Sequence, residues 1–371
     1  MSLPISTAGA GRRASAALFR ALAAALLVLP LAACDLLAEK PLGPAAAGAA
    51  AAAPSAGSAA AAGPSAGSTV GTAPATPART ATADAKLPYD VRPLLKPVNK
   101  YLGVAVDGAP QSMAGVDEFA GRIGKRPNIV EYYSGWGDEY DVNGVTNAWQ
   151  GGALPFIAWE PYKTPLADIA AGKHDDYVKR YAAAVRNTNV PVAISFAHEF
   201  NGTWYDWGTK TTTAADFVAA YRHLHDVFTQ LGAGQVIWVW SPNSINPVPT
   251  VQLKPYYPGD TYVDWVGIVA YYTHLEAGTF DTLYTPTLTQ IRTFTNKPWI
   301  IAETGSEPGT RKVSDIYNLA ANVIKRPDCL GFIWFNLNKE VDWRIEGDPQ
   351  SQNAFKQAVS DGRYSFDVKS P

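Results

Sequence analysis

The chain contains eight short runs of apolar, β-branched and aromatic residues, and this repetition limits the possible folds more than any other feature. Each run has four to six residues and is almost continuously hydrophobic. That pattern is typical of strands buried on both faces of a parallel sheet. The runs are Tyr101–Val106, Asn128–Tyr133, Pro155–Trp159, Val192–Phe196, Val236–Trp240, Trp265–Ala270, Trp299–Ala302 and Gly331–Phe335.

Helical patterns lie between these runs. Apolar residues recur at helical spacing in Leu166–Arg186 and form one stripe in Ala214–Leu231, and further helices are expected at Ser314–Lys325 and Ser351–Val359. Eight strands with intervening helices predict an α/β fold, namely a single (β/α)8 TIM barrel. A doubly wound open sheet is the alternative, but no Gly-x-Gly-x-x-Gly motif follows the first strand.

Residues 1–33 resemble a bacterial lipoprotein signal peptide. Three arginines (Arg12, Arg13 and Arg20) precede the apolar run 21–30, which is too short to span a bilayer, and Leu-Ala-Ala-Cys ends at Cys34. Cys34 is therefore the predicted lipidation site, with an ordinary secretory signal as the alternative. We expect an extracytoplasmic protein that is lipid-anchored to a bacterial cell membrane through acylated Cys34.

Residues 34–86 are predicted to form a disordered tether. Only Ala, Gly, Pro and Ser occur between positions 43 and 68, and such a segment has nothing to bury against a core. A flexible coil of this kind would hold a domain clear of a lipid surface. The folded domain is expected over residues 87–367.

Composition excludes several classes of partner and cofactor. A formal net charge of -2 provides no basic field for a phosphate backbone, so no nucleic-acid binding is expected. The two cysteines cannot form a disulfide framework, and Cys329 is expected to be a small core residue. No second histidine follows His198 at zinc-protease spacing, and no phosphate-binding loop occurs, so no metal and no cofactor are expected. We expect a monomer.

The residues that follow the predicted strands share a chemistry. In a TIM barrel the catalytic groups lie at the C-terminal ends of the strands. Here that rim carries carboxylates, amides and several indoles, and indoles suit the apolar C–H faces of sugar rings. Glu199 and Glu303 follow the fourth and seventh strands, which face each other across the mouth. Two glutamates about 5–5.5 Å apart are what a retaining glycosidase needs.

Three segments then resemble glycoside hydrolase family 26, which includes β-mannanases, β-1,3-xylanases and mixed-linkage β-glucanases. The segment at 198–207, HEFNGTWYDW, is similar to the acid/base signature of that family. The segment at 297–305, KPWIIAETG, is similar to its nucleophile strand, and YYPGDTYVDWVG at 256–267 to its approach to the sixth strand. The resemblance covers nearly the whole predicted domain.

The resemblance implies a role for each matching residue. Glu199 would be the acid/base and Glu303 the nucleophile of a retaining endo-β-glycanase that works by double displacement. Tyr271 would orient the nucleophile. The other implied substrate contacts are His198, Asn201, Trp204, Trp136 and Trp334, with Trp334 stacking at the cleavage subsite.

Some positions stay open at this stage. Val269 stands where the sixth strand of related mannanases commonly carries Asp, so β-mannan and β-1,3/1,4-glucan both remain possible substrates. Arg344, or Asp342, could build a substrate subsite, or their segment could be a solvated loop. His274 could line a subsite, and Glu160 is expected to be a structural residue of the rim. The alternatives to a degradative enzyme are a non-catalytic glycan-binding lipoprotein and an accessory hydrolase of exopolysaccharide synthesis or export.

Overall fold

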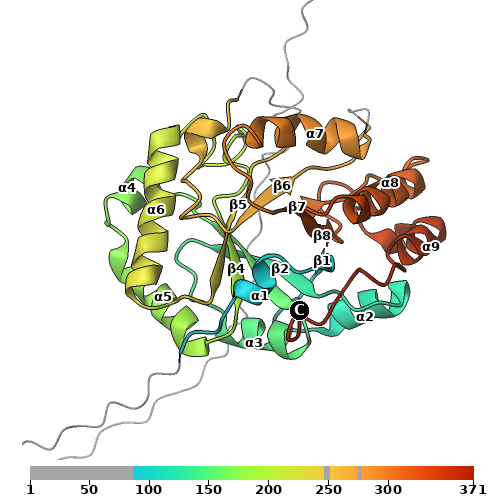
Figure 1. The fold of residues 1–371 in the computed structure, drawn as a ribbon, viewed down its shortest axis with the longest axis horizontal. Helices are drawn as coiled ribbons and strands as arrows, with labels where there is room; N and C mark the ends of the chain where they lie inside the picture. The colour runs from blue at the N-terminus through green and yellow to red at the C-terminus, as the bar shows by residue number, and fades with distance from the viewer. Residues whose placement is uncertain (1–86, 246–250, 275–277) are drawn as a thin grey trace, which may run out of the picture. The chain divides into compact units, whose positions relative to one another are not determined.

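The computed structural model describes residues 87–245, 251–274 and 278–371, and in these residues eight parallel strands close into a barrel in sequence order (Figure 1). Five residue pairs join the first strand to the last, from Tyr101 with Gly331 to Ala105 with Phe335. The predicted (β/α)8 barrel is therefore confirmed, and the open sheet is excluded. The strands are β1 (Tyr101–Ala105), β2 (Ile129–Gly135), β3 (Leu154–Glu160), β4 (Val192–Phe196), β5 (Val236–Trp240), β6 (Trp265–Val269), β7 (Trp299–Thr304) and β8 (Cys329–Phe335).

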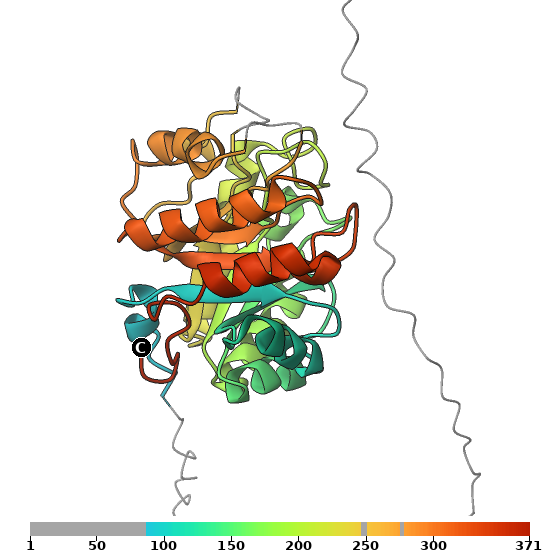
Figure 2. The same cartoon turned by 90° about the vertical axis from the view of Figure 1, so that its right-hand side faces the viewer.

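Helices surround the barrel, and Figure 2 shows the last two, in orange and red, side by side outside the strands. The described helices are α1 (Arg92–Leu95), α2 (Ala114–Ile123), α3 (Val142–Gln150), α4 (Leu166–Ala170), α5 (Asp175–Thr188), α6 (Ala214–Gln230), α7 (Phe280–Ile291), α8 (Lys312–Lys325) and α9 (Pro349–Ala358). Two 3₁₀ turns, η2 (Lys254–Tyr256) and η3 (Ile345–Gly347), complete the set.

One segment predicted as a single helix forms two helices. The pattern over Leu166–Arg186 predicts a single helix, but the chain forms α4 and α5 with a break between them. Gly172 lies in that break with a φ of 74°, a left-handed conformation that a helix cannot contain. The apolar spacing continues across the break because the buried side chains of both helices belong to one core cluster.

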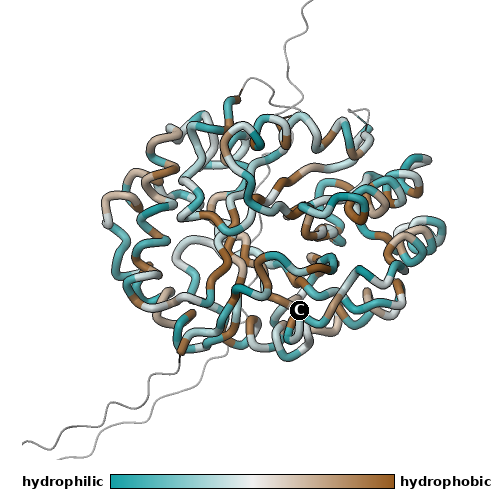
Figure 3. The backbone as a smooth tube through the Cα atoms, in the orientation of Figure 1, coloured by the Kyte–Doolittle hydropathy of each residue, from teal (hydrophilic) through white to brown (hydrophobic). Residues whose placement is uncertain are grey.

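The strands divide their side chains between two cores. On β3, Leu154 and Phe156 belong to the cluster inside the barrel, whereas Ile157 and Trp159 belong to the layer beneath the helices. Figure 3 shows hydrophobic residues concentrated along the strands and on the helices that cover them. This alternation decides which side chains at the strand ends point into the barrel mouth.

The predicted signal peptide, the tether and Cys34 lie outside the described residues. Within the part of the chain that is described, no helix combines the length and apolarity needed to cross a bilayer. Cys329 is fully buried at the start of β8, which confirms its prediction as a core residue.

Candidate active site

Glu199 stands on a constrained turn directly after β4. Ala197 and Glu199 both have a positive φ, 49° and 54°, which is costly for residues with a side chain and tends to occur at functional sites. Backbone hydrogen bonds hold this turn, since the amide of Ala197 donates to Trp159 and that of Glu199 to Ser241, at 3.0 and 2.7 Å. The neighbouring strands β3 and β5 therefore fix the position of the glutamate.

Two neutral donors hold the carboxyl group of Glu199. Trp204 donates its indole N–H to Oε2 at 2.8 Å, and Asn243, after β5, donates its amide to Oε1 at 2.5 Å. Burial raises the pKa of Glu199 to about 7, the charge of Glu303 acts in the same direction, and the two donors and Lys339 oppose both. Glu199 is 8% exposed, and a pKa of about 7 leaves its carboxyl group partly protonated at neutral pH.

Glu303, on β7, has a different set of donors. Tyr271 donates its hydroxyl to Oε1 and Tyr133, on β2, donates to Oε2. Burial raises the pKa of Glu303, whereas both tyrosines and Lys339 favour the ionised form. Each tyrosine has a pKa well above its usual value because of burial, so both hydroxyls stay protonated donors. Two donors aimed at one carboxylate suit a group that reacts as an anion.

His198 is a buried neutral residue next to Glu199. Its Nε2 lies 3.3 Å from the hydroxyl of Tyr205, and its Nδ1 has no partner among the described residues. Burial lowers the pKa of His198 to about 3, with Lys339 acting in the same direction. Trp207 is buried behind this pair and donates its indole N–H to the carbonyl of His198 at 2.6 Å.

Asn201 does not contact substrate, and that prediction is wrong. Its side chain is fully buried (0% exposed) and exchanges two hydrogen bonds of 2.8 Å with the backbone of Asn243. Asn201 therefore joins the loops after β4 and β5 and places the amide that reaches Glu199.

Trp334 is also assigned wrongly by the resemblance. It is fully buried, and its ring centre lies 5.1 Å from that of Phe355 of α9. Strand alternation turns its side chain toward the helices. The next residue, Phe335, faces inward, where its ring lies with those of Tyr133 and Tyr271. Trp343, from the loop after β8, joins this group, and its ring centre lies 4.6 Å from that of Tyr271.

Trp136 lies outside the group that surrounds the glutamates. Its ring stacks on Trp159 at 5.0 Å and also contacts Tyr177 of α5, in the layer between strands and helices. These contacts show how Trp136 packs at the end of β2, and a contact between this half-buried residue and substrate stays a prediction.

The loop after β8 is ordered by a buried lysine. Lys312 of α8 donates from Nζ to the carbonyl groups of Asp342, Trp343 and Arg344, at 3.3, 3.1 and 2.8 Å. Arg344 is paired with Asp342 through two hydrogen bonds, of 2.7 and 2.9 Å. The segment is therefore a fixed part of the mouth, and a contact between Arg344 and substrate stays a prediction.

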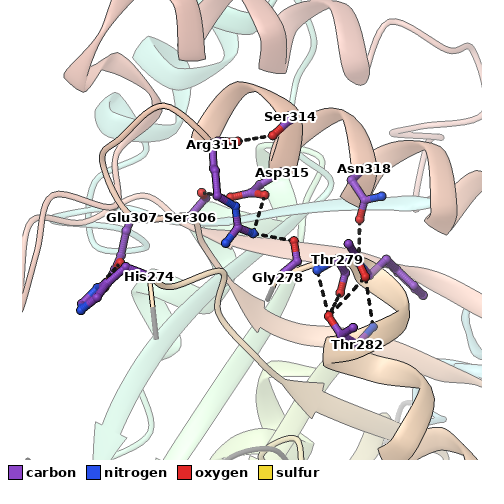
Figure 4. Close-up of polar contacts among 11 residues, drawn as sticks. His274, Gly278, Thr279, Thr282, Ser306, Glu307, Arg311, Ser314, Asp315 and Asn318 are labelled. Atoms are coloured by element: carbon purple, nitrogen blue, oxygen red, sulfur yellow. Dashed lines mark hydrogen bonds and ion pairs between the residues drawn. The ribbon is translucent and has the colours of Figure 1, made fainter. Parts of the chain in front are cut away.

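Polar contacts join the segment after β6 to the segment after β7 (Figure 4). Arg311 binds Asp315 and the carbonyl of Gly278, and Asp315 accepts a hydrogen bond from Ser306 at 2.9 Å. His274 lies beside this group with its ring 2.8 Å from Glu307, and its side chain is 74% exposed. The open assignment of His274 to a subsite stays a prediction.

Sequence reasoning misses Tyr133 and Glu131, which both lie on the inner face of β2, and it names Glu160, on the inner face at the end of β3, only as a structural residue of the rim. Burial raises the pKa of Glu131 well above its usual value, with Glu303 next in effect, and its Oε2 has no partner among the described residues. Period-two alternation is the signal that could have found all three.

Known glycoside hydrolases resemble this chain in sequence. Residues 171–318 match the model of glycosyl hydrolase family 26. Endoglucanase H of Acetivibrio thermocellus is 30% identical over 69% of this chain, and a mannan endo-1,4-beta-mannosidase of Bacillus subtilis is 27% identical over 61%. The matched region therefore resembles glycoside hydrolase family 26. The match covers 30% of the length of the first relative and 70% of the second.

Solved structures of family 26 share the fold. A β-mannanase of Bacteroides ovatus aligns with a TM-score of 0.55 and 16% identity, over 74% of this chain and 94% of that one. A modular endo-β-1,4-mannanase of Cellulomonas fimi aligns with a TM-score of 0.58 and 15% identity, over 75% of this chain and 74% of that one. At these identities the likeness shows the barrel fold alone.

Proposed function

We propose that the protein is a retaining endo-β-glycanase that hydrolyses β-mannan or β-1,3/1,4-glucan by double displacement. The observation that carries this proposal is the pair of buried glutamates at the ends of β4 and β7 with different donors. Glu199 has a pKa near neutrality and Glu303 accepts two tyrosine hydroxyls. Two carboxyl groups in environments that separate their protonation are suited to be an acid and a nucleophile.

The proposed reaction has two steps. An oxygen of Glu303 attacks the anomeric carbon while Glu199 gives its proton to the departing glycosidic oxygen, which leaves a glycosyl ester on Glu303. Esterification removes the negative charge that helps to raise the pKa of Glu199, so Glu199 ionises more readily. Glu199 then takes a proton from water as that water attacks the same carbon, and Glu303 is released as carboxylate.

The identity of the polymer is the finer part of the proposal. The two relatives described above are an endoglucanase and a mannosidase, and both support a β-linked backbone as the substrate class. Val269 lies inside the barrel and pairs with Glu303 in the β6–β7 register, so no carboxylate acts from that position. The absence of a carboxylate at position 269 keeps β-glucan, together with β-mannan, as a proposed substrate.

Product analysis of the purified chain tests this function. The panel contains β-mannan, glucomannan, mixed-linkage β-glucan, a soluble cellulose derivative and β-1,3-xylan, and the products are sized and their anomeric configuration followed by NMR. We expect internal cleavage with retention, which Glu199→Gln and Glu303→Gln both abolish. Binding of a polymer without cleavage would instead support the glycan-binding alternative, and inverted products would exclude the double displacement.

We also propose that Cys34 is acylated and holds the protein at the outer side of a bacterial membrane as a monomer. The cysteine that ends the Leu-Ala-Ala-Cys motif at position 34 supports this proposal. Cell fractionation of the wild type and Cys34→Ala tests it, with the expected result that only the wild type partitions with membranes. A Cys34→Ala variant that stays with the membrane would contradict acylation at this residue.

A further inference from the structure

A third carboxyl group points into the mouth of the barrel. Glu160 is the last residue of β3, and alternation places it on the same inner face as Leu154 and Phe156. Its strand pairs with β4, which leads directly to Glu199. The side chain therefore extends from the inner face at the same end of the barrel as the two proposed catalytic glutamates.

The carboxyl group of Glu160 has no hydrogen-bond or ion-pair partner among residues 87–245, 251–274 and 278–371. Glu199 and Glu303 each accept two hydrogen bonds. In the described part of the chain, the oxygens of Glu160 accept none and form no ion pair, although the residue is half-buried. Its oxygens face the mouth without a described protein partner, so they are available to a ligand that binds beside the two glutamates.

The main chain of Glu160, and not its side chain, makes the hydrogen bonds that stabilise this strand end. Its carbonyl accepts hydrogen bonds from the amides of Trp136 and Tyr162, both at 2.9 Å. These bonds join the segments after β2 and β3 and need no particular side chain. The expectation that Glu160 is a structural residue of the rim is therefore met by its main chain and leaves its carboxyl group unexplained.

Several charged groups act on this carboxyl group. Burial raises the pKa of Glu160 to about 8, Lys339 opposes this, and Glu303, Glu199 and Asp138 add to the rise. Lys339 belongs to the short hairpin after β8, in which Asn338 pairs with Asp342. Its ammonium group lies 6.0 Å from the ring centre of Phe335, at the inner wall of the mouth.

We propose that Glu160 is a substrate-binding residue that hydrogen bonds with a hydroxyl group of the sugar beside the cleaved bond. The inference rests on the proposed glycanase function, because it assigns the ligand as a β-linked sugar. A protonated carboxyl group offers one donor and one acceptor, which matches a sugar hydroxyl. The contact positions the sugar and takes no part in bond breaking.

The test compares Glu160→Ala and Glu160→Gln with a matched control, Glu139→Ala, in the full chain. Glu139 is a rim carboxylate whose side chain is 75% exposed and which lies 4.0 Å from Arg180. Kinetics use the polymer that the wild type cuts. Calorimetry measures the Kd of mannotetraose and of a mixed-linkage glucan tetrasaccharide in variants that also carry Glu303→Gln.

We expect Glu160→Ala to lower kcat/KM and weaken tetrasaccharide binding, each by roughly 10- to 100-fold, the usual cost of a lost strong hydrogen bond. Glu160→Gln should recover part of both losses because it keeps an acceptor and a donor. The melting temperature should not fall, since no protein partner is lost. Glu139→Ala should stay within twofold of the wild type in every measurement.

Three results would overturn the inference. One is a Glu160→Ala variant whose Kd and kcat/KM stay within twofold of the wild type, and another is a loss matched by an equal fall in melting temperature. The third is a lower kcat with unchanged Kd, which would place Glu160 in the chemistry of Glu199. The binding measurement needs no turnover, so a wild type that binds but never cuts would refute the glycanase proposal alone.

Discussion

The two central glutamates carry the same functional group, and the atoms around their oxygens make them chemically different. Glu199 accepts from an indole and an amide, and Glu303 accepts from two phenols. Phenols are the more acidic donors and favour an anion more strongly than an indole does. The division of roles between acid and nucleophile is therefore set by four neighbouring side chains from β2, the loops after β4 and β5, and the end of β6.

Replacing Trp204 by Phe tests the control of Glu199. The change keeps an aromatic ring and removes the N–H that stabilises the ionised carboxylate. The pKa of Glu199 should therefore rise, and the basic limb of kcat/KM against pH, near pH 7 in the wild type, should move to higher pH. At the optimum, activity should fall roughly tenfold. A basic limb that moves to lower pH would contradict the assigned role of Trp204.

Replacing Tyr271 or Tyr133 by Phe should affect the opposite limb. Each change removes a donor that favours ionised Glu303, so the pKa of Glu303 should rise. Because the nucleophile reacts as an anion, the acidic limb of the pH profile should move to higher pH. The expected loss in kcat/KM is roughly 10- to 100-fold per variant. An acidic limb that does not move in either variant would show that these hydroxyls do not control the nucleophile.

Trp334 should matter for stability and not for binding. Its indole fills the space between β8 and α9, so Trp334→Ala should lower the free energy of unfolding by about 3–5 kcal/mol. Denaturant unfolding measures this loss. At a temperature where the variant stays folded, its KM should equal that of the wild type. A raised KM without loss of stability would restore the subsite assignment given by the resemblance.

At the scale of elements, the order of the strands is readable from sequence because each buried strand needs its own apolar run. The position of Glu199 and Glu303 after the fourth and seventh runs then follows from the barrel itself. Which residue of a strand end faces inward is harder to predict. Trp334 and Phe335 are adjacent and both aromatic, and only the register of β8 decides between them.

The contacts that loop residues make in the site could not be predicted from the sequence. Asn243 reaches Glu199 because Asn201 fixes its backbone across two loops, and no local pattern encodes that contact. Trp343 reaches Tyr271 through a loop whose course depends on a lysine of α8. Side chains that act over such sequence separations become visible only when the barrel is closed.

Replacing Lys312 by Met tests how that loop is held. Three carbonyl groups of the loop after β8 would lose their donor, and Met fills a similar volume without replacing it. The expected result is a loss of about 1–3 kcal/mol in stability and a higher KM, because Trp343 moves relative to the site. Lys325→Met, at the other end of the same helix, is the control and should change neither quantity. An unchanged KM would mean that the position of Trp343 is set elsewhere.

The molecule as a whole maintains several carboxyl groups out of water at one end of its barrel, and this should make its stability depend on pH. The pKa of Glu199 is raised to about 7 and that of Glu160 to about 8, from 4.5. For such groups the folded state binds protons more tightly than the unfolded chain, so stability is largest below the unfolded pKa and falls as pH rises through the folded one. His198, with a pKa lowered to about 3, has the opposite effect, but only below its unfolded value of 6.5.

Between pH 6.5 and 8 these two carboxyl groups therefore act without opposition from His198, and the melting temperature of the wild type should fall across that interval. Glu160→Gln and Glu199→Gln should each reduce the slope and raise the melting temperature at pH 8, since neither variant retains a group that must stay protonated. The exposed Glu139→Gln should leave the slope unchanged. Calorimetry at several pH values makes the comparison. A melting temperature that rises over this interval, with equal slopes in all four proteins, would contradict this prediction. It would mean that the buried carboxyl groups are not protonated in the folded state, and Glu199 could then not act as an acid at neutral pH.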